Sequence, residues 1–185
     1  FKTKMKEIQI FYGTDTGNTD HVVHEILIEI FKNKKLSFCI KQVQNLTQSD
    51  WTENTHFILG VPTWYDGDLQ SDWEDYFETF CKIDFKNKKI ALFGLGDQMS
   101  YDEWFIDGIG ILAEIILKNG GEIYGNWPTE TYSFEKSKAV MTDKLFYGLA
   151  LDEDNQFDVT EVRCEQWINQ LIKESFFDTV STENN

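Results

Sequence analysis

Apolar residues along this chain alternate between short continuous runs and helical spacings. Residues Val22, Val23, Ile26, Leu27, Ile30 and Phe31 recur at helical spacing directly after the first run. Five runs are typical of buried strands: Ile8 to Tyr12, Leu36 to Val43, His56 to Gly60, Lys89 to Leu95 and Glu122 to Gly125. Because strand-like and helix-like segments alternate, the sequence predicts an α/β protein with five parallel strands.

Three further helices are indicated. Ser71 to Glu74 has capping-box spacing ahead of an aromatic helical pattern, and a second helix ends at Asn119-Gly120-Gly121. The clearest pattern runs from Cys164 to Ile172, with apolar residues at i, i+3, i+4, i+7 and i+8. We expect residues 1–177 to form one domain and Asp178 to Asn185 to be a disordered tail.

The loop between the first strand and the first helix predicts a phosphate site. It consists of Thr14, Asp15, Thr16, Gly17, Asn18 and Thr19. Unpaired N–H groups at a helix start bind anions, and threonine hydroxyls add donors. The loop lacks the lysine of an NTP-binding P-loop and the three glycines of a dinucleotide fold, so a single terminal phosphate fits best. Taken alone, the loop is equally compatible with a simple capped helix start.

Two later loops carry aromatic residues beside glycine and acidic residues. Pro62 to Trp73 follows the third predicted strand, and Gly94 to Tyr101 follows the fourth. In a doubly wound sheet, ligands bind at the carboxyl ends of the strands. We therefore expect Trp64 and Tyr101 to sandwich a planar ring system between them.

Composition narrows the class of partner. The formal net charge of -15 argues against nucleic acid and anionic membranes, and favours a basic protein partner or simple solubility. The three cysteines indicate neither a disulfide framework nor an iron–sulfur cluster, so one-electron chemistry would require an organic cofactor. His21 and His24 lack a third ligand in view, and we assign no metal.

These segments together resemble a long-chain flavodoxin, from Ile8 to about Phe177. The resemblance rests on four segments in order: Phe11 to Thr19, Pro62 to Trp73, Gly96 to Tyr101 and Leu149 to Gln156. It implies strand order 2-1-3-4-5 with helices on both faces of the sheet. It also implies an insertion in the fifth strand, from about Trp127 to Gly148, whose role the sequence does not give.

The resemblance implies noncovalent FMN, with its phosphate in the Thr14 to Thr19 loop and its isoalloxazine ring between Trp64 and Tyr101. Asp97 would accept a hydrogen bond from the pyrimidine edge, while Thr63 and Asp154 would lie near the ribityl chain. The Tyr65-Asp66 peptide would turn its carbonyl toward N5 of the one-electron-reduced flavin. The candidate cofactor-binding set also includes Gly67, Leu95 and Gly96.

The expected function is a low-potential one-electron carrier that replaces an iron–sulfur ferredoxin. An acidic, aromatic-walled site without a nearby cation opposes the negative charge of full reduction. This sequence departs from the common long-chain pattern at Tyr65-Asp66, Leu95 and Trp104, and we hypothesise that Asp66 lowers the potential further. The alternatives are an FMN-dependent NAD(P)H quinone reductase and a non-redox phosphate-binding domain.

The resemblance also implies partners and a compartment. We expect ferredoxin–NADP reductase and photosystem I, or another low-potential oxidoreductase, as partners of a monomeric carrier. The sequence has no apolar stretch of the ~18 residues that a membrane span needs. The bacterial cytoplasm is expected, or the plastid stroma if an N-terminal targeting segment has been removed before Phe1.

Overall fold

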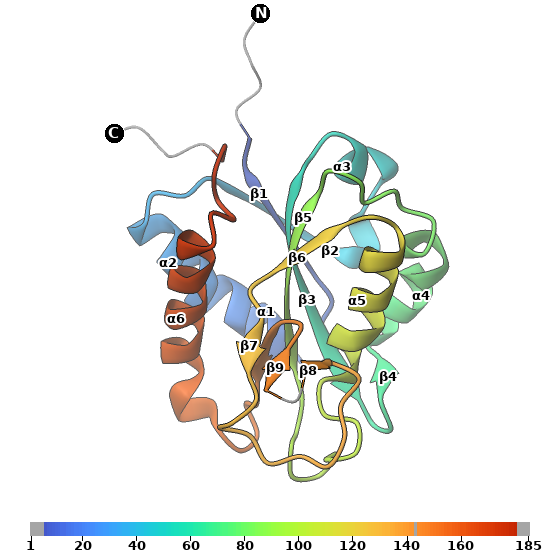
Figure 1. The fold of residues 1–185 in the computed structure, drawn as a ribbon, viewed down its shortest axis with the longest axis vertical. Helices are drawn as coiled ribbons and strands as arrows, with labels where there is room; N and C mark the ends of the chain where they lie inside the picture. The colour runs from blue at the N-terminus through green and yellow to red at the C-terminus, as the bar shows by residue number, and fades with distance from the viewer. Residues whose placement is uncertain (1–5, 143, 181–185) are drawn as a thin grey trace, which may run out of the picture.

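A parallel sheet forms the centre of the protein, and the computed structural model describes residues 6–142 and 144–180. The strands run in the order β10-β5-β3-β1-β2 (Figure 1). Their bounds are β1 Ile8–Tyr12, β2 Phe38–Gln42, β3 His56–Trp64, β5 Lys89–Leu95 and β10 Leu149–Leu151. The predicted doubly wound sheet of five parallel strands is confirmed.

The fifth position in the sheet is shared by two short strands. The strand β6 (Glu122–Tyr124) pairs with the first half of β5, where Lys89 lies opposite Glu122. The strand β10 pairs with the second half, where Phe93 lies opposite Leu149. The chain between them is the predicted insertion, so the interruption of the fifth strand is confirmed.

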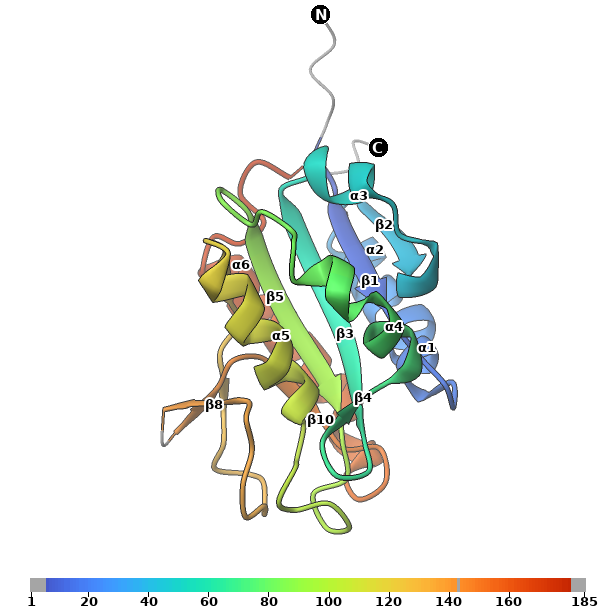
Figure 2. The same cartoon turned by 90° about the vertical axis from the view of Figure 1, so that its right-hand side faces the viewer.

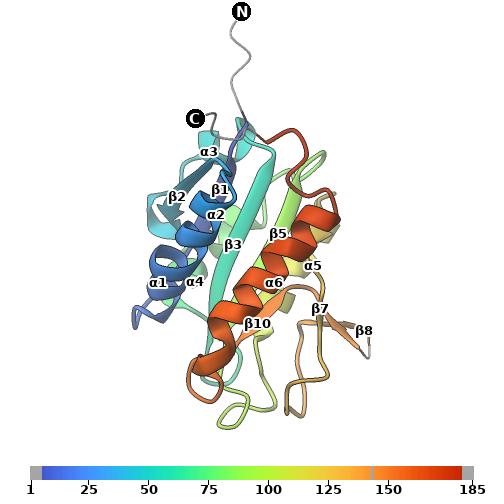
Figure 3. The same cartoon turned by 90° about the vertical axis from the view of Figure 1, so that its left-hand side faces the viewer.

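Helices cover both faces of the sheet. On one face lie α6 (Thr160–Lys173) and a continuous helical segment, made of α1 (Asn18–His21), the π-helical η1 (Val22–Leu27) and α2 (Ile28–Asn33) (Figure 3). On the other face lie α4 (Ser71–Phe80) and α5 (Asp107–Lys118), with α3 (Gln48–Thr52) near the end of the sheet where β1 begins (Figure 2). Short 3-10 turns, η2 (Val43–Asn45) and η3 (Phe157–Val159), precede α3 and α6.

The structure adjusts several predicted boundaries. The strand β3 runs four residues beyond Gly60, because β4 (Asp68–Leu69) folds back and pairs with its end, Trp64 opposite Asp68. The expected capping box at Ser71 is wrong. Ser71 is the first residue of α4, and Gln70 is the N-cap, whose side chain accepts a hydrogen bond from Trp73 N.

The insertion forms a small antiparallel sheet of its own. Its order is β7-β9-β8, with β7 Trp127–Pro128, β8 Val140–Thr142 and β9 Leu145–Phe146. Aromatic rings of the insertion pack against Phe105, with centroid distances of 5.6 Å for Tyr132, 5.7 Å for Phe134 and 6.0 Å for Phe146. The insertion is therefore packed on the segment that precedes α5.

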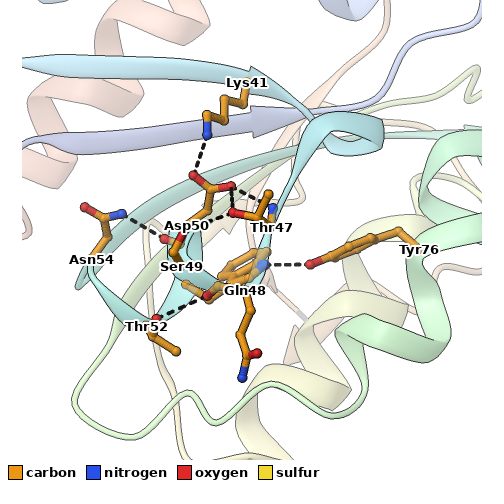
Figure 4. A network of polar contacts seen from close by, with 9 residues as sticks. Lys41, Thr47, Gln48, Ser49, Asp50, Thr52, Asn54 and Tyr76 are labelled. Atoms are coloured by element: carbon orange, nitrogen blue, oxygen red, sulfur yellow. Dashed lines mark hydrogen bonds and ion pairs between the residues drawn. The ribbon is translucent and has the colours of Figure 1, made fainter.

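A polar network joins β2, α3 and α4 (Figure 4). Asp50 accepts hydrogen bonds from Lys41 Nζ at 2.6 Å and from Thr47 N at 2.7 Å. Trp51, which is buried, donates its indole N–H to the Tyr76 hydroxyl at 2.7 Å. These bonds fix the short helix α3 against its neighbours, although isolated helices of this length are unstable.

The start of β1 and the described chain after α6 lie at the end of the sheet opposite the loops that follow β1, β3 and β5 (Figure 1). Val180 forms a bridge with Lys6. Residues 181–185 of the predicted disordered tail lie outside the described residues. Within residues 6–142 and 144–180, no helix has the length and apolar character needed to cross a bilayer.

We predict that His56 makes the folded protein sensitive to mild acid. The His56 ring is buried, and burial, together with Lys89 and Lys6, lowers its pKa to about 4. As the pH falls below the ordinary pKa of histidine, His56 takes up a proton in the unfolded chain but not in the folded protein. The free energy of unfolding is therefore unaffected by His56 above that pKa and decreases from there toward pH 4. The expected loss between pH 7 and pH 5 is about 2 kcal/mol in urea unfolding.

A His56→Gln variant should lose this part of the pH dependence, while a His21→Gln variant, at an exposed position, should keep it. Equal slopes in the wild-type and His56→Gln proteins between pH 7 and pH 5 would contradict the assignment.

Candidate functional site

A cleft of about 280 Å³ opens where β1, β3 and β5 end. It lies at the point where the strand order reverses, between β1 and β3, which is where doubly wound sheets bind ligands. Its lining residues are Thr14, Asp15, Thr16, Asn18, Thr19, Pro62, Thr63, Trp64, Tyr65, Leu95, Gly96, Asp97, Tyr101, Glu153 and Asp154. Segments far apart in the sequence therefore form one site.

Three of the predicted site residues do not line the cleft: Gly17, Asp66 and Gly67. Gly17 has a φ of 87° and precedes α1, and its N–H donates to Thr14 Oγ1 at 3.0 Å. Asp66 is exposed, whereas Gly67 is buried behind the turn. Pro62 and Glu153 line the cleft although they were not among the predicted residues.

The loop after β1 leads into the helical segment with no side chain capping the start of α1. The first N–H groups of a helix have no intrahelical partner and carry the positive end of the helix dipole. Thr14, Thr16 and Thr19 place three hydroxyl groups on the same loop. The loop can therefore bind a phosphate with neutral donors.

The Asp15 carboxylate connects this loop to α4. It accepts hydrogen bonds from Ser71 Oγ at 2.7 Å and from Gln70 Nε2 at 2.8 Å. Burial opposes ionisation, but these hydrogen bonds prevail and hold the pKa of Asp15 below its usual value. The negative charge of Asp15 thus faces the start of α4, where a helix dipole favours an anion.

Gln70 is a site-supporting residue that sequence reasoning missed. Its side chain is fully buried, and its Oε1 accepts from Trp73 N at 3.3 Å while its Nε2 donates to Asp15. A Cβ on Gly13 would lie 1.9 Å from Gln70 Oε1, so only glycine allows this approach. No local signal in the sequence points to Gln70, because glutamine is not among the preferred N-cap residues and the neighbouring Ser71 is.

Aromatic rings form the walls of the cleft. Trp64 ends β3, and Tyr101 lies in the loop that follows β5. The ring of Tyr65 makes an edge contact with each of them, with its centroid 5.6 Å from that of Trp64 and 6.5 Å from that of Tyr101. Tyr65 is 60% exposed and has a φ of 41°, a left-handed conformation that is uncommon for a bulky residue. The turn after Trp64 is thus held in a strained conformation at the edge of the cleft.

The far side of the cleft is acidic. Asp97 Oδ1 accepts from Ser100 N at 2.9 Å and from Asn155 Nδ2 at 2.8 Å, and such bonds lower the pKa of Asp97 in spite of its partial burial. Burial, with the charges of Asp97 and Asp152 nearby, raises the pKa of Asp154. None of the described lining residues is a lysine or an arginine. The cleft therefore disfavours additional negative charge on a ring held within it.

The fold and the cleft define a doubly wound α/β protein with a site for a phosphate-bearing planar ligand at the switch point. Comparison with known proteins identifies the family. The family model described as Flavodoxin matches residues 10–167. The chain belongs to the flavodoxin family.

Individual relatives span nearly the whole chain. The flavodoxin of Buchnera aphidicola is 48% identical over 168 residues, which cover 91% of this chain and 96% of that protein. Flavodoxin 1 of Escherichia coli is 41% identical over 174 residues, with coverage of 92% and 96%. A crystal structure of Fusobacterium nucleatum flavodoxin bound to flavin mononucleotide superposes with a TM-score of 0.84 at 34% identity, covering 92% of this chain and 99% of that chain.

We predict that Gln70→Met destabilises the protein. The substitution keeps the length of the side chain but removes a donor to the exposed Asp15 and the acceptor for Trp73 N, leaving this buried N–H without a side-chain partner. The expected loss in free energy of unfolding is about 1 to 3 kcal/mol, measured by urea denaturation. Gln48→Met makes the same change at an exposed position of α3 and should have little effect. Equal losses in the two variants would argue against the link.

Proposed function

We propose that this chain binds FMN without a covalent bond and serves as a low-potential one-electron carrier, not as an enzyme with a substrate of its own. The observation that carries the proposal is one cleft that joins a cation-free phosphate loop, two aromatic walls and an acidic side. When bound, FMN would supply the capacity to accept and release electrons one at a time. Membership of the flavodoxin family supports the same function.

The residues of the cleft fit the parts of FMN. The amides and hydroxyls of the Thr14 to Thr19 loop would hold the phosphate. Thr14 Oγ1 already accepts from Gly17 N, so its own O–H is left to donate. Trp64 and Tyr101 would enclose the ring system and exclude water from it.

The other predicted residues have roles that follow from their places around the cleft. Thr63 and Asp154 would lie along the ribityl chain, and Asp97 would accept from the pyrimidine edge. Leu95 and Gly96 would approach the ring by their backbone, since Leu95 is the last residue of β5 and Gly96 follows it. Tyr65 and Asp66 would present the carbonyl of their shared peptide to N5, and the left-handed φ of 41° at Tyr65 supports a special role for this turn.

The electrostatics of the cleft would make the carrier a strong reductant. The ring would acquire negative charge on full reduction, next to carboxylates and without a lysine or arginine among the described lining residues. Repulsion and desolvation both oppose that charge. The reduced carrier would therefore give up its electron readily.

The net charge of -15 supports transient association with a basic face of a redox partner. By this proposal the carrier replaces an iron–sulfur ferredoxin and exchanges electrons with ferredoxin–NADP reductase and with photosystem I or another low-potential oxidoreductase. The relatives named above are bacterial, which supports a bacterial cytoplasmic carrier over a plastid one. A quinone reductase is disfavoured because the aromatic walls leave little room for a second substrate.

The proposal is tested by adding FMN to the purified apoprotein and reducing the complex stepwise without oxygen. We expect saturable quenching of flavin fluorescence and two separate one-electron steps in the absorption spectrum. A single two-electron step would favour the quinone reductase instead. Failure to bind FMN would overturn the flavin assignment.

We predict that Asp66→Asn raises the midpoint potential of the second one-electron couple. Asp66 is exposed in the turn after Trp64, so its charge acts on the ring through solvent, and the expected rise is roughly 10 to 40 mV at low salt. Asp75→Asn removes the same charge from an exposed position on α4 that does not line the cleft, and it should shift the potential less. An unchanged potential in Asp66→Asn would exclude a role for this carboxylate.

A further inference from the structure

The described residues of the insertion between β6 and β10 do not line the cleft, yet they form hydrogen bonds with the loops that do. Ser133 N donates to Gln98 Oε1 at 2.7 Å, and Lys138 N donates to Asp107 Oδ1 at 2.7 Å. The backbone N–H groups of Glu135 and Lys136 donate to the carbonyl of Asp102, at 2.8 and 3.0 Å. These contacts span the segment that carries Tyr101, from its first residues to the start of α5.

Hydrogen bonds of Gln98 connect the insertion to the acidic side of the cleft. Its side chain is buried, and both its backbone N–H and its Nε2 donate to Asp152 Oδ2, at 3.1 and 2.8 Å. Asp152 is fully buried and its Oδ1 accepts from Asp154 N at 3.2 Å and from Asn155 N at 3.0 Å. The carboxylate thus fixes the backbone of the loop that presents Asp154 to the cleft.

Asn155 connects Asp152 to Asp97, the other carboxylate on the acidic side of the cleft. Its Nδ2 donates to Asp97 Oδ1 at 2.8 Å and also to Asp152 Oδ2 at 2.9 Å. A continuous chain of hydrogen bonds therefore runs from Ser133 in the insertion to Asp97 and the loop of Asp154. Its Gln98–Asp152 part is buried, so it determines geometry strongly, because a buried group left unpaired is costly, whereas the Asn155–Asp97 bond is exposed.

A second set of contacts holds the insertion in place behind this network. Tyr132 donates its hydroxyl to the carbonyl of Ala150 at 2.6 Å, two residues before Asp152. Arg163, the single arginine of the chain, stacks 4.4 Å above the Tyr132 ring and donates to Thr131 Oγ1 and to Gln156 Oε1. The insertion is thereby fastened to both β10 and α6, so it can serve as a fixed support.

We propose that Gln98 is a positioning residue through which the insertion sets the places of Asp97 and Asp154 in the FMN site. The effect on the flavin rests on the proposed function. The chain of hydrogen bonds from Ser133 through Gln98, Asp152 and Asn155 to Asp97, which we call the brace, is a feature of the protein without its cofactor. A segment outside the cleft then tunes both the affinity for the cofactor and its potential. The brace also gives the insertion a definite role, which its sequence does not indicate.

The test compares Gln98→Met with the wild-type protein. Methionine keeps the length of the side chain but can neither accept from Ser133 nor donate to Asp152. We expect the amides of Asp154 and Asn155 to exchange hydrogen at least tenfold faster in the apoprotein, and FMN to bind about tenfold more weakly. The midpoint potential of the second couple should rise, because the cleft carboxylates are no longer held beside the ring.

Gln166→Met is the matched control, since Gln166 is exposed on α6, and it should change none of these quantities. A folded Gln98→Met protein with wild-type exchange rates, affinity and potentials would overturn the proposal. If Gln98→Met does not fold, Tyr132→Phe is the second variant to measure, because it removes the hydroxyl that donates to Ala150 and accepts from Trp127 Nε1 but keeps the ring under Arg163. It should show the same changes to a smaller extent, and their absence would equally overturn the brace.

The two proposals fail in distinguishable ways. A wild-type protein that does not bind FMN defeats the proposed function, while the exchange rates of the apoprotein still test the brace. A wild-type protein that binds FMN, with a folded variant that behaves identically, defeats the brace alone.

Discussion

The parallel pairing of β3 with β1 on one side and β5 on the other is the constraint on which the rest of the structure depends. Because the three strands run in the same direction, the loops that follow them all lie at the carboxyl ends of the strands. The phosphate loop, the turn after Trp64 and the segment of Tyr101 meet there for this reason. Among the described residues, the cysteines are free and no group of three or more potential metal ligands occurs.

Around the cleft, carboxylates are stabilised by neutral donors in place of cations. Asp15 is bonded to Gln70 and Ser71, and Asp152 is bonded to Gln98 and to backbone amides. A lysine or arginine in either place would have cancelled the charge, whereas amide and hydroxyl groups orient the carboxylate and leave its charge in effect. The same choice of donors therefore supplies rigid loops and an acidic environment together, which suits a site that must resist added electrons.

The sequence predicts the parts of this protein that local patterns determine. The strands Ile8–Tyr12 and Lys89–Leu95 have their predicted bounds, and most of the predicted site residues line the cleft. The supporting residues were not predictable, because their partners are distant: Gln70 bonds Asp15 across 55 positions and Gln98 bonds Asp152 across 54. The N-cap of α4 was misplaced for the same reason, since a glutamine becomes a cap only when Gly13 and Asp15 are folded against it.

The division of the fifth strand also bears on how the molecule behaves among copies of itself. A long, straight edge strand offers an unbroken row of backbone donors and acceptors, which invites strand-to-strand association and aggregation. Here that edge is made of β6 and β10, three residues each, and the chain leaves the sheet between them. No incoming strand can form a continuous ladder along this side. The insertion thus protects one edge of the sheet from strand-to-strand aggregation. This protection would suit a carrier that must dissociate from its redox partners after each electron transfer.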